Sequence, residues 1–180
     1  MRIIGGKYKG RNLTPFNCEK IRPTQDKARE SLFNILREKA IGCSFLDLFG
    51  GTGAVGIEAY SRGAESVIIT DAFSDSLAVA KKNLDKIGNP DGIKLVRSDA
   101  LVFLENPPQT FDIIFVDPPY KSEILPTVLK KISDGNALNA GGVVVAETET
   151  PYSGETFSLK IIDERKYGRT RFTFMQREKQ

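Results

Sequence analysis

The sequence Asp-Pro-Pro-Tyr at positions 117–120 directly follows an apolar run, Ile113–Val116, that predicts a buried strand. Ligands of open parallel sheets bind outside the carboxyl ends of the strands, so this tetrapeptide is expected at the edge of a site. The two prolines fix the backbone, which lets the Asp117 carboxylate and the Pro118 carbonyl both accept hydrogen bonds from one amino group. Tyr120 adds a ring on which a nucleic-acid base can stack. The pattern favours group transfer to an exocyclic amino nitrogen by positioning and charge stabilisation; a rigid strand-to-helix turn is the alternative.

A glycine-rich segment follows an earlier apolar run, Phe45–Phe49. Gly51, Gly53 and Gly56 fit the spacing GxGxxG, in which glycines bring the backbone close to a ligand at the start of a helix. Asp71 comes about twenty residues later, after the next predicted strand, where a carboxylate can bind both ribose hydroxyls. The pattern is typical of any adenosine-containing cofactor, including the dinucleotide of an oxidoreductase, and a tight turn without a ligand produces it too.

Asp99 lies just after a third apolar run, in the sequence Ser-Asp-Ala at 98–100. Its carboxylate can accept a hydrogen bond from the amino group of adenine, or it can cap the helical turn expected from Leu101. The sequence leaves these two interpretations open.

Strands and helices are expected to alternate from residue 45 onward, which implies right-handed crossovers and a parallel sheet. The expected strands are Phe45–Phe49, Ser66–Thr70, Ile93–Val96, Asp112–Val116 and Gly142–Glu147. The expected helices are Gly53–Arg62, Ser74–Ile87 and Glu123–Ile132, with a helical turn at Leu101–Leu104. Two further strands, Phe157–Arg165 and Arg171–Gln176, have no helix between them and predict an antiparallel hairpin added to the sheet. The expected fold class is therefore α/β, with a mostly parallel sheet of seven strands.

The first 40 residues are the basic part of the chain. They hold ten Lys and Arg residues against four acids, a net charge of +6, whereas the whole chain carries +3. Residues 1–13 predict a short hairpin that turns at Gly5 and Gly6, and Thr24 is expected to cap a helix that ends near Ala40. Lys27 and Arg29 lie off the apolar stripe of that helix. The charge suggests a polyanionic partner, with a solvated helix face as the alternative.

Composition excludes several classes of protein. The chain of 180 residues is 40% hydrophobic and 27% charged, which is typical of a soluble globular domain. It has no histidine and two cysteines far apart, Cys18 and Cys43, so neither a zinc site nor a histidine-dependent nucleophilic relay is expected. No apolar run approaches the roughly 20 residues of a membrane helix, and the N-terminus does not resemble a signal peptide, so the expected location is the cytoplasm. A single compact domain favours a monomer.

Three motifs resemble those of known families. Asp-Pro-Pro-Tyr after the fourth strand resembles the catalytic motif of amino-methyltransferases that act on adenine N6 or guanine N2, and the glycine motif resembles their S-adenosylmethionine loop. The segment Arg-Pro-Thr-Gln-Asp-Lys-Ala-Arg-Glu-Ser-Leu-Phe-Asn-Ile-Leu at 22–36 resembles the RsmD family, which methylates guanine N2 in 16S rRNA of the small ribosomal subunit. The resemblance covers nearly the whole chain. It implies a Rossmann-like methyltransferase fold over residues 24–180, with residues 1–23 as a basic extension that contacts RNA.

The resemblance also implies which residues bind S-adenosylmethionine. They are Asp47, Gly51 and Gly53 at its methionine part, Asp71 at its ribose, and Asp99 with Ala100 at its adenine. The family often has a second acid two residues after the ribose carboxylate, where this chain has Phe73. Many members have glutamate where this chain has Asp71, and the shorter side chain alters the reach to the ribose hydroxyls.

The substrate residues follow from the same resemblance. Asp117 and the Pro118 carbonyl hold the target amino group, and Tyr120 stacks on the base. Arg22 and Thr24 lie near the entrance of the site, facing the substrate or its phosphate. If the substrate is rRNA, the expected phosphate contacts come from Arg2, Lys7, Lys9, Arg11 and Arg22. The target base must leave its stack to reach Tyr120, which favours a nucleotide in a loop.

Three other functions stay open. The same tetrapeptide serves adenine-N6 methyltransferases of DNA or RNA, although this chain lacks room for a large target-recognition domain. A non-catalytic ribosome-assembly factor would bind RNA and keep the fold, but it would not need the intact motifs. A nicotinamide-dependent oxidoreductase would use the glycine motif, but Asp-Pro-Pro-Tyr has no role in hydride transfer.

Overall fold

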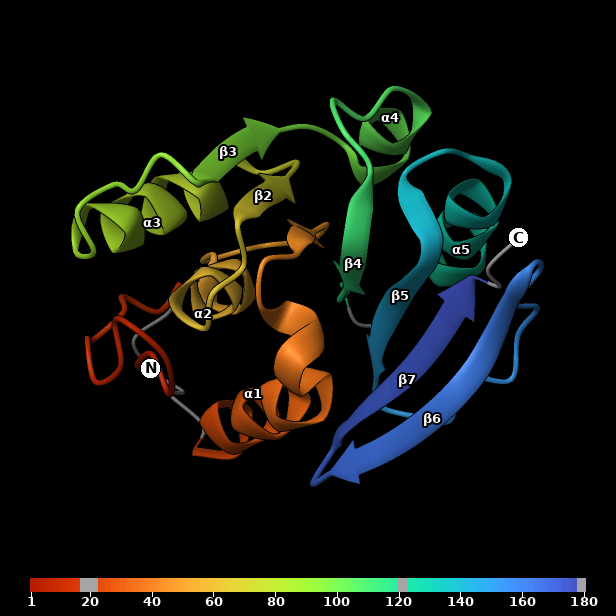
Figure 1. Cartoon of the computed structure of the whole chain (residues 1–180), viewed down its shortest axis with the longest axis horizontal. Helices are drawn as coiled ribbons and strands as arrows, with labels where there is room; N and C mark the ends of the chain where they lie inside the picture. Colours follow the sequence, from red (N-terminus) through yellow and green to blue (C-terminus); the bar gives the residue numbers. More distant parts are fainter. Residues whose placement is uncertain (17–22, 120–122, 178–180) are drawn as a thin grey trace.

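The computed structural model describes residues 1–16, 23–119 and 123–177, with the backbone alone at 23–25. Its centre is a seven-stranded sheet with the strand order β3-β2-β1-β4-β5-β7-β6 (Figure 1). The strands are β1 (Ser44–Asp47), β2 (Ser66–Asp71), β3 (Ile93–Arg97), β4 (Phe111–Val116), β5 (Leu138–Thr148), β6 (Leu159–Tyr167) and β7 (Thr170–Arg177). β7 runs antiparallel to both β5 and β6, and the other neighbouring pairs are parallel. The predicted fold class is confirmed.

Helices cover both faces of the sheet (Figure 1). The helices α1 (Pro23–Leu36), α2 (Ala54–Ser61) and α3 (Ser74–Asp85) lie on one face, and α4 (Ala100–Glu105) and α5 (Leu125–Asp134) lie on the other. Neighbouring residues of a strand point to opposite faces, so Phe45 packs in the apolar cluster under α1 and α2, whereas Leu46 packs in the cluster under α4 and α5. The parallel strands are buried on both faces and all point the same way. The polar residues that follow them therefore lie along one edge of the sheet, at the carboxyl ends of the strands.

The first helix differs from its prediction at both ends. It begins at Pro23, so Thr24 lies inside its first turn and does not cap it. Proline suits a first turn because its ring fixes φ and its missing N–H needs no partner there. The α-helix ends at Leu36, and a single 3-10 turn, Arg37–Ala40, follows it. Among the described residues, every helix is too short or too polar to cross a membrane.

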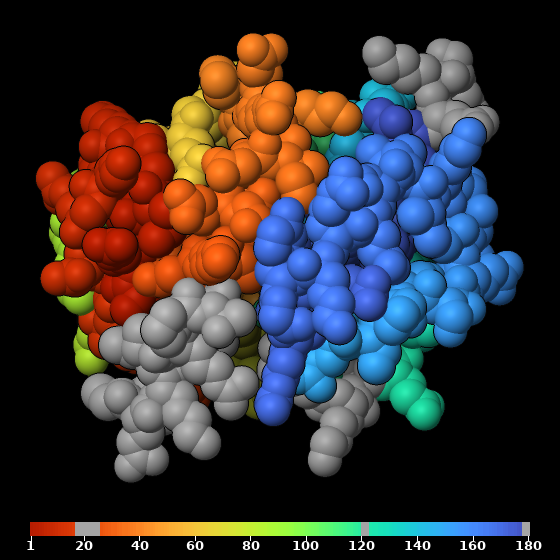
Figure 2. All heavy atoms as spheres, turned by 90° about the horizontal axis from the view of Figure 1, so that it is seen from below, coloured from red at the N-terminus to blue at the C-terminus, as the bar shows by residue number. Residues whose placement is uncertain are grey.

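The N-terminal segment, residues 1–16, forms a compact antiparallel loop instead of two regular strands. Arg2 and Asn12 form one isolated bridge. Ile3, Tyr8 and Leu13 are buried in the same apolar cluster as α1 and α2, so the segment packs as part of the core. Figure 2 shows it beside α1, with the β6–β7 hairpin on the other side of that helix. The division at residue 23 into an RNA-contacting extension and a catalytic domain stays a prediction.

Candidate active site

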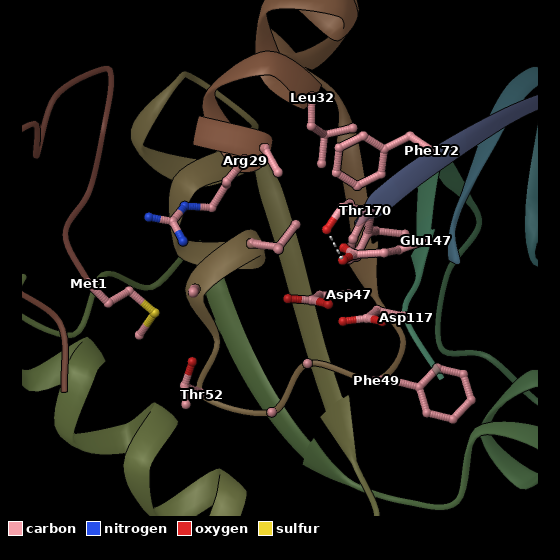
Figure 3. A pocket seen from close by; sticks show the side chains of 16 residues that line it. Met1, Arg29, Leu32, Asp47, Phe49, Thr52, Asp117, Glu147, Thr170 and Phe172 are labelled. Carbon is pink, nitrogen blue, oxygen red and sulfur yellow. Dashed lines mark hydrogen bonds between the residues drawn. The ribbon is translucent and has the colours of Figure 1, made fainter. Parts of the chain in front are cut away.

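A cavity of about 210 Å³ lies at the carboxyl ends of β1, β4 and β5 (Figure 3). Its other walls come from Met1, from α1, from the glycine-rich loop after β1, and from the first residues of α2 and β7. Of the predicted site residues, Asp47, Gly51 and Asp117 line it, and Pro118 follows directly. The acids predicted after β2 and β3 lie along the same edge of the sheet. The structure therefore brings the glycine motif and the start of the Asp-Pro-Pro-Tyr motif together, as the strand ends predict.

The glycine-rich loop makes a tight turn with open space beside it. Gly53 N donates to Gly50 O at 2.7 Å, and Gly51 and Gly53 have φ angles of 54° and 76° that favour glycine. A Cβ at Gly51 would meet nothing within 4 Å, so a ligand can approach the backbone there. Gly56 serves packing, because its Cβ would lie 2.6 Å from the side chain of Ile69.

Asp71 has partners within the protein. Its Oδ2 accepts from Gly51 N at 2.9 Å, and its Oδ1 accepts from Phe73 N at 2.8 Å. The carboxylate therefore shapes both the glycine-rich loop and its own turn. Each carboxylate oxygen has a second lone pair, so these contacts permit ribose binding by Asp71, which stays a prediction.

Asp99 caps α4, which is one of its two predicted roles. Its Oδ1 accepts from Leu101 N at 2.8 Å and from Val102 N at 3.3 Å. Both bonds go to one oxygen, so the cap is compatible with a contact between Oδ2 and adenine, which stays a prediction. Ala100 is buried in the apolar cluster beneath α4, so its side chain offers little to a ligand.

Three carboxyl groups converge in the cavity, and only two of them are predicted from the sequence. Asp47 ends β1, Asp117 follows β4, and Glu147 lies near the end of β5. The last paired residues of β4 and β5 directly precede Asp117 and Glu147, which are therefore neighbours across adjacent strands. An acid after the apolar run Val143–Ala146 is the signal that could have identified Glu147, since the same signal identifies Asp117.

Burial raises the pKa of all three carboxyl groups. The pKa of Asp47 is raised to about 7, mainly by burial, although the Gly56 N–H that donates to Oδ2 at 2.9 Å opposes the shift. The pKa of Glu147 is also raised to about 7 by burial, against the opposing hydrogen bond from Thr170. Burial, and then the charges of Glu147 and Asp47, raise the pKa of Asp117 well above its usual value. Such a cavity favours a positively charged ligand and disfavours the pyrophosphate of a nicotinamide dinucleotide.

The raised pKa values predict that the ligand-free protein loses stability as the pH rises through 7. The folded state keeps protons on Asp47 and Glu147 that the unfolded chain releases above about pH 4.5, so the free energy of unfolding falls between about pH 5 and pH 8. Glu147→Gln removes one of these groups. Between the same pH values, we expect its melting temperature to fall by about 5–10 °C less than that of the wild type. Each unit of pKa shift is worth about 1.4 kcal/mol, and each kcal/mol is worth about 2–4 °C in a chain of this size.

Differential scanning fluorimetry across this pH range measures the difference between the two proteins. Glu149→Gln, on an exposed acid two positions further along the chain, is the matched control and should keep the wild-type slope. Equal slopes for wild type and Glu147→Gln would contradict the raised pKa of Glu147.

Arg29 is buried, although its position off the apolar stripe predicts a solvated side chain. It is only 6% exposed and lines the cavity. Its guanidinium pairs with Asp26 at 3.0 Å, faces Glu58 of α2 at 3.6 Å and donates to the carbonyl of Arg2. Helical periodicity compares positions within one helix, so it cannot reveal partners in α2 and in the N-terminal segment.

The predicted RNA-contacting residues differ in how the structure uses them. Arg2, Lys7 and Lys9 are exposed on the N-terminal segment. Arg11 is exposed as well, but it donates to the backbone carbonyl at the end of α3 at 2.6 Å. Thr24 lies in the first turn of α1. The two predicted residues that lie outside the described parts of the chain are Arg22 and Tyr120.

Known proteins match the chain over almost its full length. The family model described as Conserved hypothetical protein 95 matches residues 1–176. Ribosomal RNA small subunit methyltransferase D of Escherichia coli K12 is 34% identical over 187 residues, which cover 100% of this chain and 91% of that protein. The putative rRNA methyltransferase YlbH of Bacillus subtilis 168 is 38% identical over 150 residues, 82% of each protein. The solved structure of the putative methyltransferase yhhF from Escherichia coli has a TM-score of 0.87 at 30% identity, over 100% of this chain and 99% of its own. This chain therefore belongs to the family Conserved hypothetical protein 95, the RsmD family that its sequence resembles.

Proposed function

We propose that this protein transfers a methyl group from S-adenosylmethionine to the N2 amino group of a guanine in 16S rRNA of the small ribosomal subunit. The observation that carries the proposal is the Asp117 carboxyl group in a cavity that is bordered at one end by a glycine-rich loop with open space beside it. Relatives at 34% and 35% identity are small-subunit rRNA methyltransferases by name, which supports the RNA substrate. The Arg-Pro-Thr segment supports guanine N2 over adenine N6. We further propose that the protein acts as a monomer in the cytoplasm.

The proposed cofactor fits the chemistry of this edge of the sheet. S-adenosylmethionine carries a sulfonium and an ammonium group, and both positive charges suit a cavity lined by buried carboxyl groups. When bound, it supplies an electrophilic methyl group. In the proposal, the residues that border it from methionine to adenine are Asp47, Gly51, Gly53, Asp71, Asp99 and Ala100.

Catalysis in this proposal depends on positioning and on one proton transfer. The lone pair of an exocyclic amino group is delocalised into the base, so the nitrogen is a poor nucleophile. The Asp117 carboxylate and the Pro118 carbonyl accept hydrogen bonds from its two N–H groups and turn the nitrogen toward sp3 geometry, in line with the methyl group. The methylated nitrogen is positively charged and releases a proton. Asp117 accepts this proton, which the raised pKa of its buried carboxyl group favours.

Phe73 offers a test of the cofactor site that does not depend on catalysis. Its ring is 67% exposed, and it follows Asp71 by two positions. A ring beside the ribose carboxylate is expected to stack on adenine, which is worth about 1–3 kcal/mol. We therefore expect Phe73→Ala to raise the Kd for S-adenosylmethionine by about 10-fold or more, measured by calorimetry. Ile162→Ala, at a half-exposed apolar residue of β6, is the control, and an unchanged Kd in Phe73→Ala would contradict the stacking.

The exposed cations of the N-terminal segment predict how RNA binding depends on salt. Each phosphate contact contributes about 0.7–0.9 to the slope of log K against log salt concentration. The double variant Lys7→Ala with Lys9→Ala should therefore bind 16S rRNA more weakly and lose about 1.5 from that slope, as fluorescence anisotropy can measure. Lys130→Ala on α5, across the sheet, is the control. A wild-type slope near zero would argue against an RNA surface on this segment.

A methyl-transfer assay tests the proposal as a whole. Labelled S-adenosylmethionine is offered with small ribosomal subunits that lack the modification, and the rRNA is then digested to nucleosides. N2-methylguanosine is the expected product. N6-methyladenosine would overturn the base assignment, and equal transfer to duplex DNA would favour a DNA methyltransferase. Cofactor binding with no transfer to subunits or naked rRNA would favour an assembly factor, and binding of NADH in place of S-adenosylmethionine would favour an oxidoreductase.

A further inference from the structure

Glu147 is a carboxyl group of the cavity for which methyl transfer, as proposed above, has no use. Its side chain reaches the cavity from the carboxyl end of β5 (Figure 3). At this end the walls are Leu32 of α1 and Phe172 of β7, whereas the glycine-rich loop borders the opposite end. Asp47 and Asp117 lie between the two ends (Figure 3). A ligand group that reaches Glu147 is therefore on the side of Asp117 that faces away from the cofactor loop, flanked by apolar side chains.

We propose that Glu147 selects guanine as the methyl acceptor by accepting a hydrogen bond from its N1–H. The inference rests on the proposed function, since it names the group that reads the base whose N2 amino group is methylated. Guanine carries N1–H beside the N2 amino group on one edge of its ring, so that edge offers adjacent donors. Glu147 and Asp117 follow paired residues of adjacent strands, which run about 4.8 Å apart, so adjacent acceptors face those donors.

The same arrangement rejects adenine. Adenine presents an unprotonated N1 beside its N6 amino group, and a carboxylate oxygen would repel the lone pair of that nitrogen. A base bound through its amino group at Asp117 therefore meets Glu147 with a donor if it is guanine and with an acceptor if it is adenine. An N1–H that donates to Glu147 would also stabilise the charged form of a group whose pKa burial raises to about 7.

Thr170 orients the side chain that reads the base. Its hydroxyl donates to Glu147 Oε1 at 3.3 Å, and in our proposal Oε2 accepts from the base. In Glu147→Gln, the hydroxyl of Thr170 would hold the amide oxygen at the Oε1 position. The amide NH2 would then face the base, where it opposes N1–H and suits an unprotonated N1. The variant should therefore shift the preference of the site from a base with N1–H toward a base with an unprotonated N1. A general weakening of base binding would not produce this shift.

The test compares two bases at one position of the RNA. The nucleotide methylated by the wild type is first mapped, and rRNA fragments are then made with guanosine or 2-aminopurine at that position; 2-aminopurine keeps the amino group but has an unprotonated N1. The assay is run at about pH 8.5, above the pKa of about 7 that burial gives to Glu147, so that this group is charged. Under these conditions the wild type should methylate guanosine faster than 2-aminopurine. In Glu147→Gln, the ratio of the guanosine rate to the 2-aminopurine rate should fall by about 10- to 100-fold, which is the worth of one hydrogen bond to a charged group. The Kd for S-adenosylmethionine should stay within about twofold of the wild-type value.

A second variant keeps the proposal falsifiable if the first loses all activity. Adding Thr170→Val to Glu147→Gln frees the amide to rotate, so the double variant should recover part of the guanosine rate. Glu149→Gln is the control and should keep the wild-type ratio. An unchanged ratio in Glu147→Gln, no recovery in the double variant, or a large loss of cofactor affinity in Glu147→Gln would each overturn the inference. A wild type that does not methylate guanine N2 at all would instead sink the proposed function, so the two failures are distinguishable.

Discussion

Asp117→Ala is expected to lower the rate constant for methyl transfer by at least about 10²- to 10³-fold. The carboxylate holds the target amino group and takes its proton, so the substitution removes interactions that strengthen as positive charge develops on the nitrogen in the transition state. Asp47 and the glycine-rich loop remain in place, and the Kd for S-adenosylmethionine should therefore change by less than about threefold. Single-turnover transfer to unmodified small subunits measures the rate constant, and calorimetry measures the Kd.

Two further variants separate the chemistry of Asp117 from its effect on folding. Asp117→Asn keeps an acceptor oxygen that can hold the target amino group, so this variant should retain more activity than Asp117→Ala. Both substitutions remove a carboxyl group whose charge is disfavoured by burial, so both proteins should melt no lower than the wild type near pH 8. Glu149→Ala, at an exposed acid, should leave rate and Kd unchanged. Loss of cofactor binding in Asp117→Ala would assign the motif a structural role.

The acids that the sequence identifies share one property. Asp71, Asp99 and Asp117 each lie at or just after the end of an apolar strand. Parallel strands that are buried on both faces appear in a sequence as continuous apolar runs, and the first acid after each run falls at the carboxyl edge of the sheet. Three acids far apart in the chain can therefore be assigned to one edge of the sheet without coordinates. The strand order is not predicted in this way and follows from the structure.

The position of Glu147 and the burial of Arg29 could not be predicted from the sequence. Glu147 also follows an apolar run, but the strand expected from the sequence, Gly142–Glu147, includes it as its last residue. Its position beside Asp117 follows only from the pairing of β4 with β5. The buried position of the Arg29 side chain depends on Glu58 of α2 and on a backbone carbonyl of the N-terminal segment. Contacts between separate elements leave no periodic signal, so neither hydrophobicity nor spacing reveals them.

One buried acid of α2 fixes the N-terminal segment. Glu58 has a fully buried side chain and accepts hydrogen bonds from Ile4 N and Gly5 N, each at 2.8 Å. It also faces Arg29 of α1 at 3.6 Å and pairs with Arg62, just after α2, at 2.7 Å. The N-terminal segment, α1 and α2 therefore meet at a single carboxylate. The basic residues of the segment and the wall of the cavity formed by α1 depend on the same group.

Glu58→Ala is accordingly expected to lower the free energy of unfolding by about 3–5 kcal/mol, or roughly 10 °C in melting temperature. The substitution leaves Arg29 buried without its carboxylate at Glu58 and leaves two backbone N–H groups without their acceptor. It should also weaken rRNA binding, because the exposed cations of the N-terminal segment lose their fixed positions, while the Kd for S-adenosylmethionine changes little. Urea unfolding measures the stability, with Glu65→Ala at an exposed acid as a control that should change it by less than about 0.5 kcal/mol. A loss below about 1 kcal/mol in Glu58→Ala would mean that apolar contacts alone hold the segment in place.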